Sequence, residues 1–171
     1  MHSFSGYGKE IRRLSIKQGV PMDQTLSDER IAFLRSDYEQ GFIRYCGFRA
    51  DKITPGRFTS RVKIDDHHRQ QDGFIHAGVM ATMADHTAGY SAFTVVDDTF
   101  QILSIEFKIN FLKPAFGAGL ACESTVIRKG RQILVAESEV YDLRDKERVL
   151  AAKATVTLMA VPKETLVQQS K

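Results

Sequence analysis

An apolar stretch that begins at His76 and contains a single carboxylate, Asp85, constrains the fold of this chain more than any other feature. A polar turn at Gly73 precedes it, and Ala, Met and Thr then continue without Pro, so the pattern predicts a helix that runs to about Val95. Because this helix is apolar nearly all round, most of its surface must be buried. An ionised carboxylate out of water is costly unless it is paired or used in chemistry. We therefore expect Asp85 to be buried and functional.

The start of the same helix is a second candidate for chemistry. The first N–H groups of a helix have no acceptor within the helix, and they carry positive partial charge. Such groups suit a developing oxyanion, while Asp85 suits the part of acid, base or nucleophile. The alternative is a structural Asp85 that pairs with a buried Arg or a backbone group, although no Arg or Lys lies one helical turn away.

Length and composition indicate one soluble domain. The 171 residues suffice for one proper core and are too few for two comfortable domains. Hydrophobic residues make up 43% and charged residues 26%, which is typical of globular proteins. The net charge of +3 is compatible with an anionic ligand, but the excess is too small to predict a nucleic-acid partner.

The cysteines and the termini indicate a cytoplasmic location. Cys46 and Cys122 lack the spacing of metal ligands and are expected to be free thiols in a reducing compartment. The first residues are polar rather than a secretory signal. The longest apolar stretch, Val79 to Val96, contains a charged residue, so we expect no membrane span.

The remaining pattern predicts an α+β architecture of one antiparallel sheet around one long helix. Residues 1–24 form an expected basic arm, residues 25–162 the domain with its own N-terminal helix, and residues 163–171 a C-terminal tail. Ser27 should cap a helix that continues to about Gln40. The expected strands are Phe42 to Ala50, Arg57 to Ile64, Ile102 to Leu112, Gly119 to Arg128, Gln132 to Leu143 and Val149 to Val161.

Three features together resemble the hotdog-fold acyl-CoA thioesterases, most closely their phenylacetate-type branch. They are the segment Gly73-Phe74-Ile75-His76-Ala77-Gly78, then Asp85, and later the alternating strand that runs from Leu103 to Pro114. The resemblance covers roughly residues 42–161. It implies a hotdog fold that hydrolyses acyl-CoA thioesters and requires neither a metal nor an organic cofactor.

The resemblance also implies a role for individual residues. Asp85 matches the nucleophile or general base, and Ala77 matches the residue whose N–H polarises the thioester carbonyl. Ala77 departs from the family's Gly, which raises the question of whether the position needs a positive φ. The other matching positions in the catalytic region are His76, Gly78, Gln70 and Ser104. A predicted hairpin turn has basic side chains that can meet CoA phosphates in the family; its residues are Arg128, Lys129, Gly130 and Arg131.

Several alternatives stay open at this point. A hotdog hydratase or dehydratase would use a His with an acidic residue in another arrangement, and a non-catalytic module would bind acyl-CoA without hydrolysing it. His76 and Ser104 could be a structural cap and an ordinary strand hydroxyl. His67 and His68 suggest a metal site, but adjacent residues point to opposite sides and no closed ligand set follows, so we expect none.

The spacing of the two candidate groups predicts an oligomer. Eight residues separate Ala77 from Asp85, so they lie about 12 Å apart along a helix that rises about 1.5 Å per residue. An attacking atom must come within about 3–3.5 Å of the carbonyl carbon. One helix cannot supply both groups to one thioester, whereas antiparallel helices of two subunits can. We therefore expect a homodimer, or a dimer of dimers, with shared sites.

Overall fold

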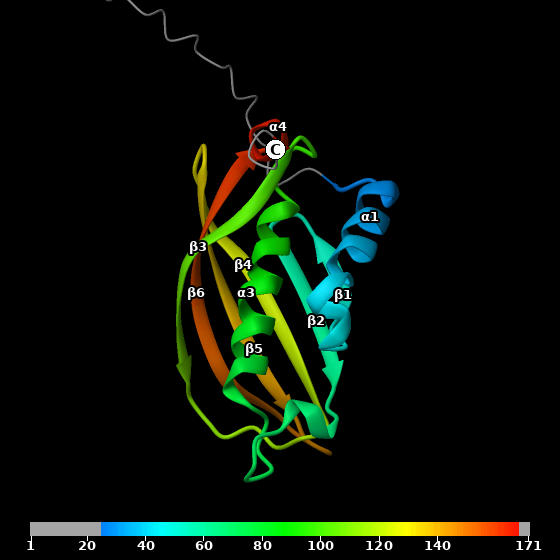
Figure 1. The fold of residues 1–171 in the computed structure, drawn as a ribbon, viewed down its shortest axis with the longest axis vertical. Helices are drawn as coiled ribbons and strands as arrows, with labels where there is room; N and C mark the ends of the chain where they lie inside the picture. The colour runs from blue at the N-terminus through cyan, green and yellow to red at the C-terminus, as the bar shows by residue number, and fades with distance from the viewer. Residues whose placement is uncertain (1–24, 168–171) are drawn as a thin grey trace, which may run out of the picture.

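The computed structural model describes residues 25–167, so the predicted basic arm at residues 1–24 and the last four residues, 168–171, lie outside the described residues. Five helices and six strands form one unit (Figure 1). The helices are α1 (Asp28–Tyr38), α2 (Gly41–Tyr45), the 3₁₀ helix η1 (Asp66–His68), α3 (Ala77–Phe93) and α4 (Lys163–Val167), and the strands are β1 (Arg49–Thr54), β2 (Arg57–Lys63), β3 (Phe100–Phe111), β4 (Gly119–Lys129), β5 (Ile133–Leu143) and β6 (Arg148–Pro162).

The strands form one antiparallel sheet in the order β1-β2-β4-β5-β6-β3, and this sheet curves around α3 (Figure 1). Alternate residues of β5 and β6 are buried, because one face of each strand is covered by the helix. The predicted α+β hotdog architecture is therefore confirmed. Among the described residues, no helix has the length and apolar character needed to cross a membrane.

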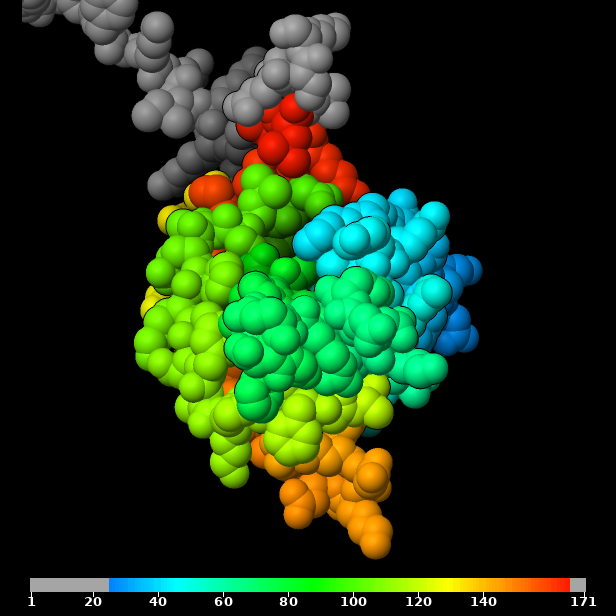
Figure 2. Space-filling model, turned by 60° about the horizontal axis from the view of Figure 1, so that its bottom comes forward, coloured from blue at the N-terminus to red at the C-terminus, as the bar shows by residue number. Residues whose placement is uncertain are grey.

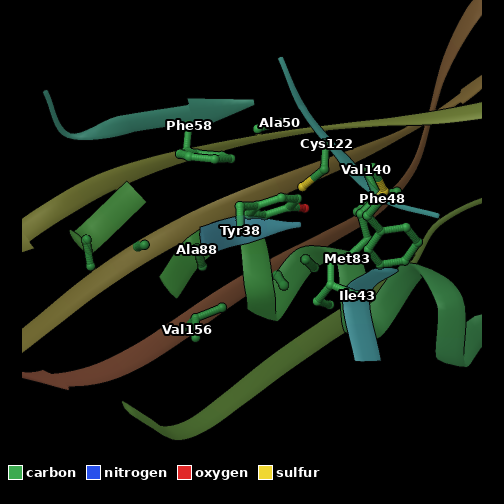
Figure 3. Close-up of a cluster of buried hydrophobic side chains, with 14 of the residues drawn as sticks. Tyr38, Ile43, Phe48, Ala50, Phe58, Met83, Ala88, Cys122, Val140 and Val156 are labelled. Atoms are coloured by element: carbon green, nitrogen blue, oxygen red, sulfur yellow. The ribbon is translucent and has the colours of Figure 1, made fainter. Parts of the chain in front are cut away.

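The core lies between α3 and the concave face of the sheet. Tyr38 reaches into it from α1 and stacks on Phe58 of β2, with ring centroids 4.9 Å apart (Figure 3). The Tyr38 hydroxyl is hydrogen-bonded to Thr87 Oγ1 of α3, which is also bonded to Ser60 of β2. These contacts tie α1, α3 and the sheet together. Cys122 is buried in the same core, and both cysteines are free thiols as expected.

The N-terminal helix differs in part from its prediction. Ser27 caps α1 by accepting a hydrogen bond from the Arg30 N–H, as expected, but the helix ends at Tyr38 rather than Gln40. The predicted strand from Phe42 to Ala50 is wrong except at its last two residues, because residues 41–45 form α2 and β1 begins at Arg49 and continues to Thr54. Gly41 adopts a φ of +54° there, which redirects the chain into a second helix that buries Ile43.

The C-terminal tail predicted for residues 163–171 begins as a short helix, α4, in its described part. The segment between β2 and α3 also contains a helical turn, η1. The four strands after α3 match their predictions to within two residues at each end.

The two edge strands of the sheet differ in whether other parts of the chain cover them. Arg35 of α1 donates hydrogen bonds to the carbonyls of Ala50 and Asp51, and Glu39 accepts one from the Ala50 N–H, so α1 covers the edge at β1. At the other edge, β3 is 12 residues long and pairs with β6 on its inner side, but no strand of the described chain lies on its outer side. A long, apolar, unpaired edge favours pairing with another strand.

The core predicts a large difference between two phenylalanines. Phe58 is fully buried and Phe42 is 64% exposed. Phe58→Ala should lower the free energy of unfolding by about 3–5 kcal/mol, because it removes a packed ring and leaves a cavity. Phe42→Ala should change it by less than about 0.5 kcal/mol. Urea denaturation monitored by circular dichroism measures both, and equal losses would contradict this description of the core.

Candidate active site

The start of α3 is built by the residue just before it. His76 is the N-cap of the helix, and its Nδ1 accepts a hydrogen bond of 2.9 Å from the Gly78 N–H. The Ala77 N–H has no acceptor within residues 25–167, and it is exposed. No residue other than Gly has a positive φ among the described residues, so Ala is as suitable here as the family's Gly. Ala77 thus presents a free amide at the positive end of a helix.

The loop before α3 is held firmly on several sides. The Ile75 N–H donates to the Ala115 carbonyl at 2.7 Å, and the His76 N–H donates to the His68 carbonyl at 2.8 Å. Arg69 donates to the carbonyls of Gly73 and Gly117. This backbone scaffold fixes the position of the Ala77 amide.

Asp85 lies in the middle of α3 and receives a hydrogen bond from Ser104 of β3. The Ser104 hydroxyl donates to Asp85 Oδ1 at 2.7 Å. Asp85 is partly exposed in the single chain, so the expectation that it is buried is wrong: its carboxylate lies beside the edge strand β3, where the sheet ends. Neither an Arg nor a Lys pairs with it among the described residues. The structural ion pair considered for Asp85 is therefore absent, and its Oδ2 atom is free to accept a proton.

His86, beside Asp85, is held as a neutral ring. Its Nε2–H donates to the Tyr38 carbonyl at 3.1 Å, and the ring packs against Tyr38 and Tyr90. Desolvation by this burial lowers the pKa of His86, although the backbone hydrogen bond and the charge of Asp85 oppose the shift. The lowered pKa favours the neutral form of His86 beside Asp85.

Asp85 lies between two pockets. A smaller one, here called the inner pocket, has a volume of about 210 Å³ and includes Asp85, Gly89, Tyr90, Phe93, Ile102 and Ser104. A larger one, here called the wide pocket, has about 600 Å³ and includes Gln40, Phe42, Gly78, Ala81, Asp85 and Phe107. Figure 2 shows a hollow between the cyan segment that contains α2 and the yellow-green β3.

The amide and the carboxylate lie in different pockets. Ala77 shares a third pocket with Gln70 and Phe111, whereas Asp85 and Ser104 border the inner pocket. Because Ala77 and Asp85 are both on the continuous helix α3, about 12 Å separates them along its axis. The structure thus brings Gln70 to Ala77 and Ser104 to Asp85, but it does not bring the two pairs together within one chain.

The predicted basic turn borders a different pocket from those of Ala77 and Asp85. Arg128, Gly130 and Arg131 border a pocket of about 480 Å³ at the hairpin between β4 and β5. Ile133, next in this hairpin, pairs with Met159 of β6, which pairs with Leu103 of β3. The hairpin therefore lies at the same end of the sheet as Leu103, with β6 between β5 and β3. Desolvation lowers the pKa of Lys129 in this hairpin.

His68, in the turn before α3, has a structural role. Asp65, His67 and His68 bring three possible metal-ligand atoms within 4.8 Å. However, His68 Nδ1 accepts from the Asp65 N–H and His68 Nε2 donates to the Cys46 carbonyl, so neither nitrogen has a lone pair to give. This chemistry does not fit a metal site.

Several residues of the site were missed by sequence reasoning. Phe42 of α2 borders the wide pocket, and Gly89 and Tyr90 border the inner pocket. Gly89 and Tyr90 follow Asp85 by about one helical turn, so the 3.6-residue period could have placed them beside it. No local signal links Phe42 to this site, because α2 was not predicted.

The chain is similar in sequence and fold to proteins of one known superfamily. The sequence model of the Thioesterase superfamily matches residues 72–149. A thioesterase family protein of Silicibacter pomeroyi is 37% identical, with a TM-score of 0.73 over 75% of this chain and 96% of that protein. A protein of Saccharolobus solfataricus named as an esterase is 30% identical over 112 residues, 66% of this chain and 77% of that protein. The chain belongs to the thioesterase superfamily.

A more distant likeness agrees with this assignment at the level of the fold. A phenylacetic acid degradation-related protein of Ralstonia eutropha superimposes with a TM-score of 0.65 at 20% identity, over 75% of this chain and 97% of that one. The resemblance to hotdog thioesterases is therefore confirmed, and the general activity of this thioesterase is thioester hydrolysis.

The cap at His76 gives a test of its role. His76→Ala should lower the free energy of unfolding by about 0.5–2 kcal/mol, because the Gly78 N–H loses its acceptor. His76→Asn should restore most of that stability, since Asn is a good N-cap. Thermal denaturation measures both variants. If Asn restores stability but thioesterase activity stays low, His76 does more than cap the helix.

Proposed function

We propose that this thioesterase hydrolyses acyl-CoA thioesters to a free acid and CoA, with a free helix-start amide and Asp85 as its two reacting groups. The observation that carries the proposal is that α3 holds both groups. Its Asp85 carboxylate is oriented by a hydrogen bond from Ser104, and its Ala77 N–H has no acceptor in the described chain. A thioester needs only these two functions, polarisation of its carbonyl and delivery of a nucleophile.

The chemical steps follow from those groups. The Ala77 N–H binds the carbonyl oxygen and stabilises the negative charge of the tetrahedral intermediate. Asp85 either takes a proton from the attacking water or attacks the carbonyl carbon itself and forms an anhydride that water then cleaves. In both routes the C–S bond breaks, and the CoA thiolate leaves and is protonated. The Ser104 hydrogen bond holds Oδ1, which leaves Oδ2 of Asp85 to face the substrate.

The same proposal requires a second copy of the chain. The edge strand β3 exposes large apolar side chains that no described residue covers: Leu103 is 43% exposed, Ile105 52% and Phe107 41%. Antiparallel pairing of β3 with its copy would cover this edge. It would also place α3 of one subunit antiparallel to α3 of the other.

Shared pockets indicate which parts of α3 and β3 lie at the same level. Phe111 shares a pocket with Ala77, Phe107 with Ala81, and Ser104 with Asp85. If a two-fold axis passes near Phe107, each residue of β3 faces the partner residue that is equally far from 107 on the other side. The partner subunit's Phe111 would therefore lie opposite Leu103. The partner subunit's Ala77 would then be level with Asp85, as the reaction requires.

Charge supports this register. About an axis at Phe107, Glu106 lies opposite the partner subunit's Lys108, and Lys108 lies opposite the partner subunit's Glu106. Glu106 and Lys108 pair with Thr157 and Thr155 of β6, so both are on the convex face of the sheet. Opposite charges directly across an antiparallel pair are favourable.

The dimer also gives the basic hairpin a place. The hairpin is level with the Leu103 end of its own β3, so in the proposed dimer it would be level with the Phe111 end of the partner's β3. Arg128, Lys129 and Arg131, which turn at Gly130, would thus lie at the far end of the partner's wide pocket. Charge-assisted hydrogen bonds from Arg suit CoA phosphates. Pairing of such dimers into tetramers, and a cytoplasmic location, stay predictions.

Replacement of the carboxylate tests the proposed chemistry. Asp85→Asn should lower kcat for acyl-CoA hydrolysis by at least about 100-fold, because the base or nucleophile is lost while the shape is kept. Release of the CoA thiol, measured with a thiol reagent over a panel of acyl-CoAs, gives the rates. The control is Asp51→Asn, an exposed carboxylate on β1 at the other edge of the sheet.

The outcomes separate the possibilities. A wild-type protein that binds acyl-CoA but releases no thiol is a binding module rather than an enzyme. Hydration of an enoyl-CoA without thiol release would indicate the hydratase alternative. Turnover of Asp85→Asn within a few-fold of wild type would remove Asp85 from the mechanism.

A further inference from the structure

The carboxylate of Asp142 takes no part in the chemistry described above, yet it is fully buried near the end of β5. No other Asp or Glu is buried among residues 25–167. It pairs with Arg144, but a buried ion pair is weak evidence for stability, because apolar residues of similar volume often stabilise a fold as well. Asp142 therefore needs an explanation other than stability alone.

Both oxygens of Asp142 hold the loop that connects β3 to β4. Oδ1 accepts a hydrogen bond of 2.8 Å from the Gly117 N–H, and Oδ2 accepts one of 3.2 Å from the Phe116 N–H. Arg144 completes this arrangement: its Nε donates to Asp142 Oδ2 at 2.8 Å, and its Nη2 donates to the Pro114 carbonyl at 3.1 Å. Asp142 and Arg144 thus bind three residues of one loop.

The loop packs closely against the end of β5 at Gly117. A Cβ atom added there would overlap both the Leu143 carbonyl oxygen and Asp142 Oδ1, so even Ala does not fit without a shift of the backbone. The next residue, Ala118, donates its N–H to the same Leu143 carbonyl at 3.1 Å. The position of this loop is therefore set by β5, and any change at Asp142 must displace it.

The same loop holds the segment of chain that leads into α3. The carbonyl of Ala115, in the middle of the loop, accepts a hydrogen bond of 2.7 Å from the Ile75 N–H, two residues before the free amide of α3. Arg69 adds a second link, because its guanidinium donates to the carbonyls of Gly73 and Gly117. The buried carboxylate is thus connected to the start of α3 through this loop, by hydrogen bonds alone.

We propose that Asp142 is a positioning residue for thioester hydrolysis: through the loop between β3 and β4 it fixes the Ala77 N–H at the place where the carbonyl oxygen binds. The proposal rests on the acyl-CoA hydrolysis proposed above, in which that amide stabilises the tetrahedral intermediate. A displacement of about 1 Å in such a group can cost about 100-fold in rate. Asp142 does not border the pocket of Ala77, so it acts on the amide and not on the substrate.

Replacement of one carboxylate oxygen tests the proposal. Asp142→Asn keeps the shape of the side chain, but its NH₂ group cannot accept, so at least one of the N–H donors around it loses its acceptor and the loop shifts. Measured by CoA thiol release, kcat for acyl-CoA hydrolysis should fall by at least about 10-fold and KM should change by less than about threefold, because a transition-state interaction is weakened.

A milder variant makes the test independent of whether Asp142→Asn folds. Arg144→Lys keeps the positive charge, but a single ammonium group cannot reproduce the planar fork that bonds both Asp142 and the Pro114 carbonyl. Arg144 is partly exposed, so the smaller side chain leaves no closed cavity. Its kcat should fall by at least about threefold, again with KM nearly unchanged.

The matched control removes a buried hydrogen bond at the opposite end of α3. Thr94 is the C-cap of that helix, is 1% exposed, and accepts a hydrogen bond of 2.7 Å from the Gly56 N–H. Thr94→Val keeps the shape and leaves that N–H without its acceptor, so it should lower the midpoint of thermal denaturation. Its kcat should stay within about twofold of wild type, because distant sites act independently.

The carbonyl stretch of a bound thioester reports on the amide directly. In an Asp85→Asn background, an acyl-CoA with a ¹³C-labelled carbonyl binds without rapid turnover, and a hydrogen bond from the Ala77 N–H shifts its infrared stretch to lower frequency. Addition of Asp142→Asn or Arg144→Lys should reduce this shift. Addition of Thr94→Val should leave it unchanged, since a loss of stability alone does not move the amide.

The results distinguish the positioning role from the function on which it rests. If wild type hydrolyses acyl-CoA and the folded variants at Asp142 and Arg144 keep its kcat, the function stands and the positioning role is wrong. The role is also wrong if kcat falls while the carbonyl stretch keeps its full shift, or if Thr94→Val lowers kcat as much. If wild type releases no CoA thiol, the proposed function fails and the positioning role fails with it.

Discussion

The packing of α3 against the concave face of the sheet is the constraint on which the site depends. Ser138 of β5 donates a hydrogen bond to the Ala84 carbonyl, and Thr87 is bonded to Ser60 of β2. These buried contacts fix the rotation of the helix about its own axis. The next residue, Asp85, then points toward Ser104 at the β3 edge of the sheet. A small rotation would turn the carboxylate into the core, where its charge would be unsatisfied.

The same rigidity is the reason for our proposal that a complete site needs two chains. A helix cannot shorten, so the roughly 12 Å between its start and Asp85 is fixed by backbone geometry. A second chain is the simplest way to bring an amide to that carboxylate. The unpaired edge at β3 is suited to hold that chain, whereas the edge at β1 is already covered by Arg35 and Glu39.

Much of the fold could be predicted from sequence because its signals are local. The long apolar stretch indicated α3, the alternation after it indicated four strands, and Ser27 indicated the start of α1. The helix α2 was missed because Gly41 and its positive φ redirect the chain, and the apolar residues that follow read equally well as a strand. The burial of Asp85 was overestimated because hydropathy alone does not show which side of a helix the sheet covers.

The site was predictable where a motif carries it and not where distant elements meet. The motif around His76 and Asp85 predicted both the helix start and the carboxylate. The bonding of His68 depends on its contact with Cys46, which is distant in sequence. The pocket beside Gly89 depends on β3 in the same way, and residue spacing reveals neither contact. The wall at Tyr90 depends on Asp37, more than 50 residues earlier in the chain.

A mixed dimer tests the shared site most directly. Asp85→Asn and Gln70→Ala chains, each shown to be poorly active alone, are combined and the heterodimer is purified by two different tags. In the proposed arrangement Gln70 acts with Ala77 and opposite the partner subunit's Asp85, so one site of the heterodimer would carry both substitutions and the other would carry neither. The account predicts about half the wild-type rate per dimer, since the sites act independently. A verified heterodimer no more active than the better parent would contradict it.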